Sequence, residues 1–480
     1  MSVLKGLEPA SVLGFFEEIC NIPHISGHEQ ALSDYCVAFA KERGLYCEQD
    51  ALGNVIIVKE ASDGYEDVEP IMIQGHLDMV GDKVPECPID MEREPIHILV
   101  EGDNITADGT TLGGDDGIAV AYGLALLDAE DIGHPRLEIV LTVGEEVGLD
   151  GATAIDLSCC KAKRLLNIDS EEEGVFTAGC AGGMRVDCRI PMKTIEKTGV
   201  LCELTTHGFL GGHSGVEIHK QRGNAILTVG RFLLFLKGQV AYDVVTMSGG
   251  AKDNVIPKNA TAKILVADVE ALKGAVAEFN QVIKNEYAIS DPKVQLEWKV
   301  TEETTKKVMT RDSAEKLLTA LNLMPNGVQT MSSDLPGLVE TSLNLGVMQL
   351  TESELNLCFS VRSSIESAKE FLGSKLRQLT EMLGGEAGYH GQYPGWAYAR
   401  ESGLRDLCVK VYEEQYGKTP KIDVIHAGLE CGILASKIEG LDCISIGPNM
   451  ADIHTPDERI SISSIARVWE FIKGVVAEKE

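Results

Sequence analysis

Short apolar runs recur along the first part of the chain, and polar side chains follow where each run stops. Ile71–Ile73 form one such run between Pro70 and Gly75, which is typical of a short buried strand. His76 and Asp78 come next, two residues apart, so in an extended chain their side chains point the same way. The pattern predicts a strand that delivers an imidazole and a carboxylate to one place.

Three other apolar runs predict strands of the same kind. Each is followed by carboxylates or by a loop that carries a histidine: Leu137–Val143 precedes Glu145 and Glu146, Leu165–Ile168 precedes Asp169, and Cys443–Ile446 precedes His454. Ligands of open α/β sheets bind in the crevice outside the carboxyl ends of the strands. We therefore expect all these polar side chains to share one site.

Two stretches carry the signals of a helix start. Ser26 and Glu29 have the spacing of a capping box, and the apolar repeat that follows predicts a helix ending at Gly44. Asp115 and Asp116 lie at the start of another predicted helix, which runs to about residue 129. One of these two carboxylates is expected to cap the helix, which leaves the other for the site.

The middle of the chain follows a different pattern. Its predicted strands and helices fit an antiparallel sheet with helices on one face, an α+β layer. After about residue 395 the alternation of the first part resumes, so we predict a split α/β domain, 1–183 plus 395–480, with a second domain inserted at 184–394. The strands predicted in the insert are Val200–Thr206, Ala262–Val266, Val294–Val300, Leu343–Leu350 and Leu355–Val361, and its helices are 221–238, 269–287, 312–322 and 365–383.

The composition indicates a soluble, folded protein of the cytoplasm. The 480 residues suffice for two or three domains, and 44% hydrophobic with 24% charged residues is ordinary for globular chains. A net charge of −31 argues against binding to nucleic acid or to an anionic membrane. Thirteen cysteines without a CxxC pair indicate reduced thiols. The start of the chain lacks the apolar core of a signal peptide, and no run is long enough to span a membrane.

Two imidazoles and three carboxylates make up the candidate ligand set. This mixture suits zinc, or else manganese or cobalt, and five ligands are too many for one tetrahedral ion with an open position. They suit two ions bridged by one carboxylate and a water molecule. The five residues are His76, Asp115, Glu146, Asp169 and His454.

Two further carboxylates have expected roles beside these ligands. Because the side chains of adjacent residues diverge, we assign Glu146 to a metal ion and Glu145 to the general base that takes the proton from the water. Asp78 is expected to hold the second ring nitrogen of His76. A metal ion, a base and no covalent nucleophile indicate hydrolysis of an amide bond.

Five ordered motifs are Gly75-His76-Leu77-Asp78, Leu112-Gly-Gly-Asp115-Asp116-Gly, Gly144-Glu145-Glu146-Val-Gly, Asn167-Ile-Asp169-Ser-Glu and Ile453-His454-Thr-Pro. They resemble the superfamily of two-zinc aminopeptidases and carboxypeptidases that includes aminoacylase, peptidase T and carnosinase-like dipeptidases. Three more motifs, at Gly211–His219, Asp253–Pro257 and His426–Gly432, are similar to the bacterial aminoacyl-histidine dipeptidases. The resemblance covers essentially the whole chain and implies a two-zinc peptidase catalytic domain with an inserted lid domain.

This resemblance also implies roles for the ligands. Asp115 would bridge the two zinc ions. His76 and Asp169 would complete one metal site, and Glu146 and His454 the other.

The resemblance also implies roles for residues of the lid domain. His213 would reach the tetrahedral oxyanion, within its own chain or across a dimer. Asn254, Arg362 and the Gly428 loop would hold the carboxylate of the substrate. The chain departs from much of the superfamily at one point, since Ser360 stands two residues before Arg362 where an aspartate is usual.

The implied activity is hydrolysis of dipeptides of the Xaa-His type, with broad tolerance at the first residue. An N-acyl-amino-acid deacylase or a tripeptidase on the same scaffold would differ only in the shape of its pocket. A non-catalytic metal-binding relative would have lost a ligand or the base, and neither is missing from this sequence. The partners implied are a small peptide substrate and a second copy of the chain in a homodimer.

Overall fold

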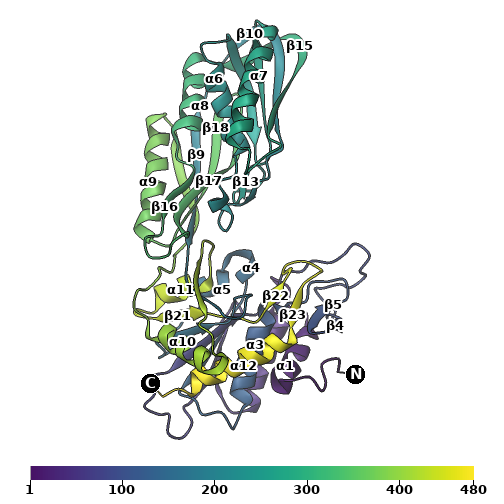
Figure 1. Cartoon of the computed structure of the whole chain (residues 1–480), viewed down its shortest axis with the longest axis vertical. Helices are drawn as coiled ribbons and strands as arrows, with labels where there is room; N and C mark the ends of the chain where they lie inside the picture. The colour runs from purple at the N-terminus through teal and green to yellow at the C-terminus, as the bar shows by residue number, and fades with distance from the viewer. Residues whose placement is uncertain (1, 480) are drawn as a thin grey trace. The chain divides into compact units, whose positions relative to one another are not determined.

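The computed structural model describes residues 2–479, and the chain divides into two compact units (Figure 1). The first unit consists of residues 2–180, 398–424 and 429–479, and the second of residues 181–397 and 425–428. The predicted fold class, an α/β domain interrupted by an α+β insert, is confirmed. The domain limits at 183/184 and 394/395 stay predictions.

The first unit is built on an eight-stranded mixed sheet of order β1-β2-β6-β3-β7-β21-β8-β20. Beside it lies a four-stranded sheet of order β22-β23-β5-β4. The strands are β1 (Tyr46–Gln49), β2 (Val55–Lys59), β3 (Ile71–His76), β4 (Ile98–Glu101), β5 (Asn104–Ala107), β6 (Leu137–Thr142), β7 (Arg164–Asn167), β8 (Val175–Cys180), β20 (Lys421–Ile425), β21 (Asp442–Ser445), β22 (Met450–Ala451) and β23 (Arg459–Ser461). The helices are α1 (Ala10–Cys20), α2 (Gln30–Glu42), α3 (Gly114–Asp128), α4 (Glu145–Gly148), α5 (Asp150–Ala154), α10 (Gly403–Tyr416), α11 (Glu430–Lys437) and α12 (Ile462–Ala477).

Four central strands of this sheet run parallel. β3 pairs in parallel with both β6 and β7, and β7 pairs in parallel with β21. Nearly every residue of these strands is buried, as expected for parallel strands covered on both faces. Their carboxyl ends therefore meet at one edge of the sheet, where the polar residues of the sequence motifs follow.

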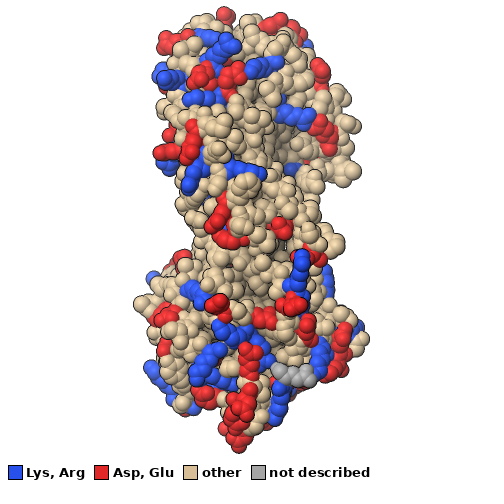
Figure 2. Space-filling model, turned by 90° about the vertical axis from the view of Figure 1, so that its left-hand side faces the viewer, with Lys and Arg blue, Asp and Glu red and all other residues tan. Residues whose placement is uncertain are grey.

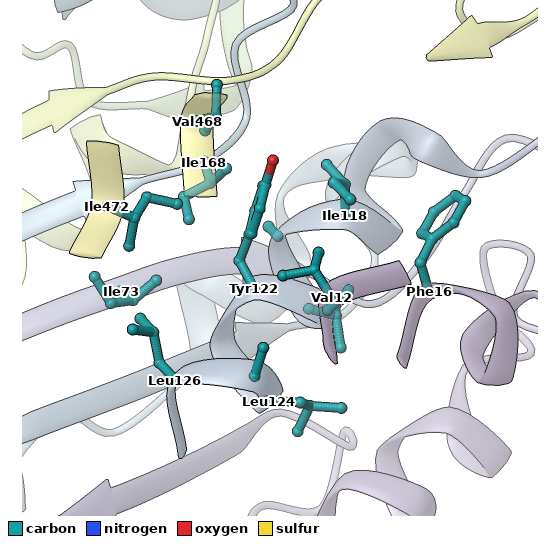
Figure 3. Packing of buried hydrophobic residues seen from close by; sticks show 14 of the residues in the cluster. Val12, Phe16, Ile73, Ile118, Tyr122, Leu124, Leu126, Ile168, Val468 and Ile472 are labelled. Atoms are coloured by element: carbon teal, nitrogen blue, oxygen red, sulfur yellow. The ribbon is translucent and has the colours of Figure 1, made fainter. Parts of the chain in front are cut away.

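Helices α3 and α12 meet in the core of the first unit (Figure 3). Tyr122 of α3 is fully buried, stacks on Trp469 of α12 at 6.1 Å between ring centroids, and donates its hydroxyl proton to the Ile465 carbonyl at 2.9 Å. Figure 3 shows Tyr122 among aliphatic side chains such as Val12 and Ile472. The helix that begins at the candidate site is thus fixed at its middle by the end of the chain.

The predicted capping box at Ser26 is wrong. Helix α2 begins at Gln30, and no side chain caps it. The Ser26 hydroxyl donates instead to the Asp78 carboxylate at 2.9 Å, because the chain returns next to it: Ile25 forms a β-bridge with Met79.

The second unit is an antiparallel nine-stranded sheet with helices. Its strand order is β15-β10-β14-β12-β17-β18-β9-β19, with β16 paired to β17. The strands are β9 (Gly182–Pro191), β10 (Thr194–His207), β12 (Tyr242–Gly249), β14 (Ala260–Val266), β15 (Gln295–Met309), β16 (Gly327–Met331), β17 (Val339–Leu350), β18 (Glu354–Ser363) and β19 (Glu386–Tyr393), with a separate pair β11 (Gly212–His213) and β13 (Val255–Ile256). The helices are α6 (Ala225–Leu236), α7 (Val269–Glu286), α8 (Arg311–Leu323) and α9 (Glu366–Met382), with the short 3-10 helix η1 (Ile218–Lys220).

The surface carries charges of both signs. On the face shown in Figure 2, acidic and basic side chains are interspersed, although the chain as a whole has a net charge of −31. Within residues 2–479, no helix has the length and apolar character needed to cross a membrane.

Candidate metal centre

All five predicted ligands lie at the carboxyl edge of the central strands. His76 is the last residue of β3, Glu146 lies in α4 just after β6, and Asp169 follows β7 by two residues. Asp115 is in the first turn of α3, and His454 lies in the loop between β22 and β23. Segments far apart in the sequence therefore converge on one place.

Asp115 stands between the two histidines. Its Oδ1 atom is 3.2 Å from Nε2 of His76, and its Oδ2 atom is 3.1 Å from Nε2 of His454. Asp169 Oδ1 lies 3.7 Å from the same nitrogen of His76, and Glu146 Oε1 lies 2.6 Å from that of His454. The donors thus form two groups that share one carboxylate.

The chemistry of these donors fits cations. Asp115 Oδ1 and Glu146 Oε1 are buried and, apart from the nearby imidazoles of His76 and His454, have no donor among the described residues. Three groups of donor atoms lie within 4.8 Å of one another: Asp115 with Glu146 and His454, His76 with Glu145 and Glu146, and His76 with Asp116 and Asp169. Since buried acceptors without donors are costly, these residues suit bound metal ions.

Electrostatics support the same interpretation. Burial raises the pKa of Asp169 to about 6, and the neighbouring charges of Asp115 and Glu146 add to the effect. Burial likewise raises the pKa of Glu145 well above its usual range, with further contributions from Asp169 and Glu430. Carboxylates crowded in a buried place repel one another, and a cation relieves this repulsion.

Asp78 makes contacts that its position two residues after His76 does not predict. Its carboxylate accepts hydrogen bonds from the backbone amides of Glu145 at 3.0 Å and Glu146 at 3.2 Å. Nδ1 of His76 donates to the backbone carbonyl of Asp78 at 2.9 Å, and the Asp78 carboxylate lies 3.5 Å away. Asp78 therefore contacts both His76 and the loop that carries the two glutamates.

The cap expected from Asp115 or Asp116 is not found. Helix α3 begins after Gly113 without a cap from its own segment, and Asp116 accepts a hydrogen bond from the His76 amide at 3.1 Å. The amides at this helix start are bound instead by Glu458, which no local sequence pattern reveals because it lies more than 340 residues away.

In the second unit, residues from separate sequence motifs lie close together. Arg362 is 7% exposed, its Nη1 donates to the Tyr393 hydroxyl at 2.9 Å, and its Nε has no hydrogen-bond partner among the described residues. A Cβ atom on Gly215 would lie 3.2 Å from Arg362 Nε and 3.0 Å from His213 Cε1. Among the described residues, no carboxylate pairs with this arginine.

His213 has one tautomer fixed by its surroundings. Its Nδ1 accepts hydrogen bonds from the amides of Gly215 and Val216, both at 3.2 Å, so in the neutral ring the proton is on Nε2. Burial and the Arg362 charge lower the pKa of His213 below its usual value. The ring therefore offers one N–H donor.

Asn254 and Gly428 lie beside this cluster. The Asn254 carbonyl accepts from the Ser214 amide at 2.8 Å, which ties its loop to the His213 loop. A Cβ atom on Gly428 would approach Tyr393 Cε2 to 2.9 Å. His426, which the sequence left without a role, is buried, and its Nε2 lies 2.7 Å from Ser342 Oγ.

Comparisons with known proteins agree with this architecture. Residues 204–291 match the family described as a peptidase dimerisation domain. The cytosol non-specific dipeptidase of Escherichia coli (strain K12) is 37% identical over 482 residues, which cover 100% of this chain and 99% of that protein.

Solved structures extend the comparison. The crystal structure of aminoacylhistidine dipeptidase from Vibrio alginolyticus aligns with a TM-score of 0.93 and 34% identity, covering 98% of this chain and 97% of that one. Aminopeptidase PepT from Bacillus cereus shares the fold, with a TM-score of 0.57 and 16% identity over 98% of each chain. The predicted resemblance is thus confirmed over the full length, and the chain belongs to the M20 metallopeptidase family, among its dipeptidases.

Proposed function

We propose that the protein is a metal-dependent dipeptidase that hydrolyses a broad range of dipeptides, Xaa-His among them. The observation that carries this proposal is the position of Asp115, with one carboxylate oxygen toward His76 and the other toward His454. The names of the two full-length relatives support the substrate class, since one is a non-specific dipeptidase and the other an aminoacylhistidine dipeptidase.

The proposed centre holds two divalent ions. His76, Asp169 and Oδ1 of Asp115 would hold one ion, and His454, Glu146 and Oδ2 of Asp115 the other. Mixed nitrogen and oxygen donors favour zinc, with manganese or cobalt as alternatives. When bound, two ions of this kind polarise a carbonyl and make a water molecule acidic.

Glu145 is the proposed general base. It lies beside the ligand Glu146 and, with His76, forms part of one group of donor atoms. It would take a proton from the attacking water and deliver it to the leaving amine. Asp78 would hold this base in place, because its carboxylate binds the amides of both glutamates.

For the second unit we propose contacts with the substrate. The Nε2–H of His213 would donate to the oxyanion that forms when water adds to the amide carbonyl. Arg362, buried and without a carboxylate partner among the described residues, would pair with the substrate carboxylate, with Asn254 and Gly428 beside it. We further propose that the protein works in the cytoplasm as a homodimer, in keeping with its match to a dimerisation domain.

The test is a substrate panel assayed with chelated protein before and after zinc, manganese or cobalt is added. We expect metal-restored cleavage of β-alanyl-histidine, leucyl-histidine and dipeptides without histidine. Cleavage of N-acetyl amino acids or tripeptides instead would favour the deacylase or tripeptidase alternatives. If metal binds and every substrate stays intact, the dipeptidase proposal is wrong.

Replacing the base tests the mechanism. Glu145→Gln should retain both ions and lower kcat by several orders of magnitude, because the amide accepts no proton. Glu146→Gln is the matched control on the neighbouring residue and should weaken metal binding itself. Unchanged turnover in Glu145→Gln would contradict the assignment of the base.

A further inference from the structure

Glu458 binds four successive backbone amides with one carboxylate. Its Oε2 accepts from Leu112 at 2.8 Å and Gly113 at 3.2 Å, and its Oε1 accepts from Gly114 at 2.8 Å and Asp115 at 3.4 Å. The side chain is only 3% exposed. Each carboxylate oxygen therefore holds two N–H groups, in a place where water cannot replace them.

The segment that Glu458 holds is not regular helix. Gly113 has a φ of +72°, and Asp115 and Asp116 have non-helical backbone angles inside the first turn of α3. No side chain of this segment caps the helix. Buried amides without an acceptor are costly, so the path of the backbone through Asp115 depends on the Glu458 carboxylate.

Glu458 is itself anchored, and its loop also carries a proposed ligand. The Glu458 carbonyl accepts from the Thr106 hydroxyl of β5 at 2.8 Å, and its amide donates to the Thr455 carbonyl at 3.1 Å. His454 lies four residues earlier in the same loop. One short stretch thus supplies a donor to the metal centre and fixes the backbone of the donor opposite.

We propose that Glu458 is a positioning residue that sets the spacing between Asp115 and His454. It contacts no reacting atom, and its effect would pass through the backbone of Asp115. The inference rests on the proposed two-ion centre and adds a residue to it. Loss of Glu458 should therefore weaken binding of the ion held by His454, Glu146 and Asp115 more than binding of the other ion.

The experiment measures metal binding rather than activity alone. Wild-type protein, Glu458→Gln and a control are stripped with chelator and titrated with Co²⁺ and Zn²⁺ by calorimetry, with the absorption spectrum of the Co²⁺ form as a second signal. The control is Glu138→Gln. Glu138 is fully buried in the same unit and accepts from the amides of Lys161 and Ala162 at 2.8–3.0 Å, near the opposite end of β6.

The expected result is a selective loss. The amide nitrogen of a glutamine accepts no hydrogen bond, so two of the four N–H groups lose their acceptor. One binding step should weaken about 10–100-fold, as for other residues that orient ligands, and the other step should change less than about threefold. KM for a dipeptide should stay within about twofold of wild type, and excess metal should restore kcat.

Three outcomes would overturn either the positioning role of Glu458 or the two-ion centre, and the titrations distinguish these two cases. If Glu458→Gln binds both ions like wild type, or if Glu138→Gln loses as much affinity, Glu458 has no positioning role. If wild-type protein binds fewer than two ions, the metal centre itself is wrong.

A second variant covers the case in which Glu458→Gln does not fold. Glu458→Asp keeps the charge and withdraws the carboxylate by one methylene group. In metal-free protein, hydrogen exchange of the amides at 112–115 should then become at least about tenfold faster than in wild type. Unchanged exchange would also overturn the inference.

Discussion

Carboxylates that bind backbone amides recur around the metal centre. Asp78 binds the Glu145 and Glu146 amides, Asp116 binds the His76 amide, and Glu458 binds the segment that ends at Asp115. None of the three belongs to the proposed ligand set. The end of β3, the start of α3 and the segment of the two glutamates are therefore held in place by carboxylates of the protein itself.

At the residue scale, Gly75→Ala tests how closely this packing is set. A Cβ atom on Gly75 would lie 2.4 Å from Ala119 Cβ and 2.5 Å from Asp116 Oδ2, the atom that binds the His76 amide. Either β3 or α3 must shift, so we expect a loss of about 1–3 kcal/mol in the free energy of unfolding. Urea denaturation of the full chain measures this loss of stability. The affinity for metal should fall as well.

The matched control for that change is Gly14→Ala on the exposed side of α1. No heavy atom lies within 4 Å of the added methyl group, and alanine favours a helix over glycine by about 1 kcal/mol. Gly14→Ala should therefore stabilise the protein. A Gly75→Ala protein as stable as wild type would contradict the packing described at β3.

A second residue, His426, makes stability depend on pH. Burial, together with the charges of Arg362 and His213, lowers the pKa of His426 to about 3. The unfolded chain binds this proton below about pH 6.5 and the folded chain does not, so stability is complete above 6.5 and falls as the pH drops toward 3. The slope from this one group reaches about 1.4 kcal/mol per pH unit.

Unfolding of wild type and His426→Gln at pH 7.5, 5.5 and 4.5 measures this contribution. The variant should lose less stability on acidification than wild type does. The control is His219→Gln, which removes an exposed histidine of the same unit and should follow the wild-type curve. If His426→Gln and wild type have parallel pH profiles, the buried histidine is not the cause.

At the element scale, the sequence predicted the central strands well and their partners poorly. Apolar runs and alternation depend on neighbouring residues. They located Ile71–Ile73 inside β3, although β3 extends through His76, which was predicted to follow the strand. Ser26, Asp78 and Glu458 act through partners 52, 67 and at least 343 residues away. No local pattern contains that information, which is why the capping predictions failed and Glu458 was missed.

Strand β15 provides a prediction about assembly. It spans Gln295–Met309 at the edge of the second unit's sheet, and Val300 in its middle is 50% exposed. A strand edge of this length can pair with another chain, and lysines on an edge oppose such pairing. β15 already carries Lys299, Lys306 and Lys307, so the exposed apolar Val300 is the residue in its middle that favours a contact. We expect Val300→Lys to convert the proposed dimer to a monomer, as measured by light scattering after size exclusion.

Met382→Lys is the control for assembly. Met382 is 76% exposed on α9 of the same unit and lies outside both the sheet and the matched residues 204–291, so its substitution should leave the dimer intact. A wild-type protein with the mass of one chain would contradict the dimer. A dimer that survives Val300→Lys would place the contact elsewhere.

At the scale of the whole molecule, the two units should respond differently to metal. All proposed ligands belong to the first unit. An ion that binds only the folded state stabilises that state by about 2.7 kcal/mol when the concentration of free ion is about a hundred times its Kd. Calorimetric scans should show that chelator lowers the melting temperature of one transition and leaves the other unchanged. His454→Ala, with a ligand removed, should respond less to added metal.

The chain order of the first unit has a consequence for synthesis on the ribosome. Strand β21 pairs with β7 in the middle of the sheet, yet it comes from residues 442–445, after the second unit has been made. His454 and Glu458 emerge later still. A nascent chain therefore carries an unfinished sheet and an incomplete set of proposed ligands until residues 442–458 have left the exit tunnel of the ribosome.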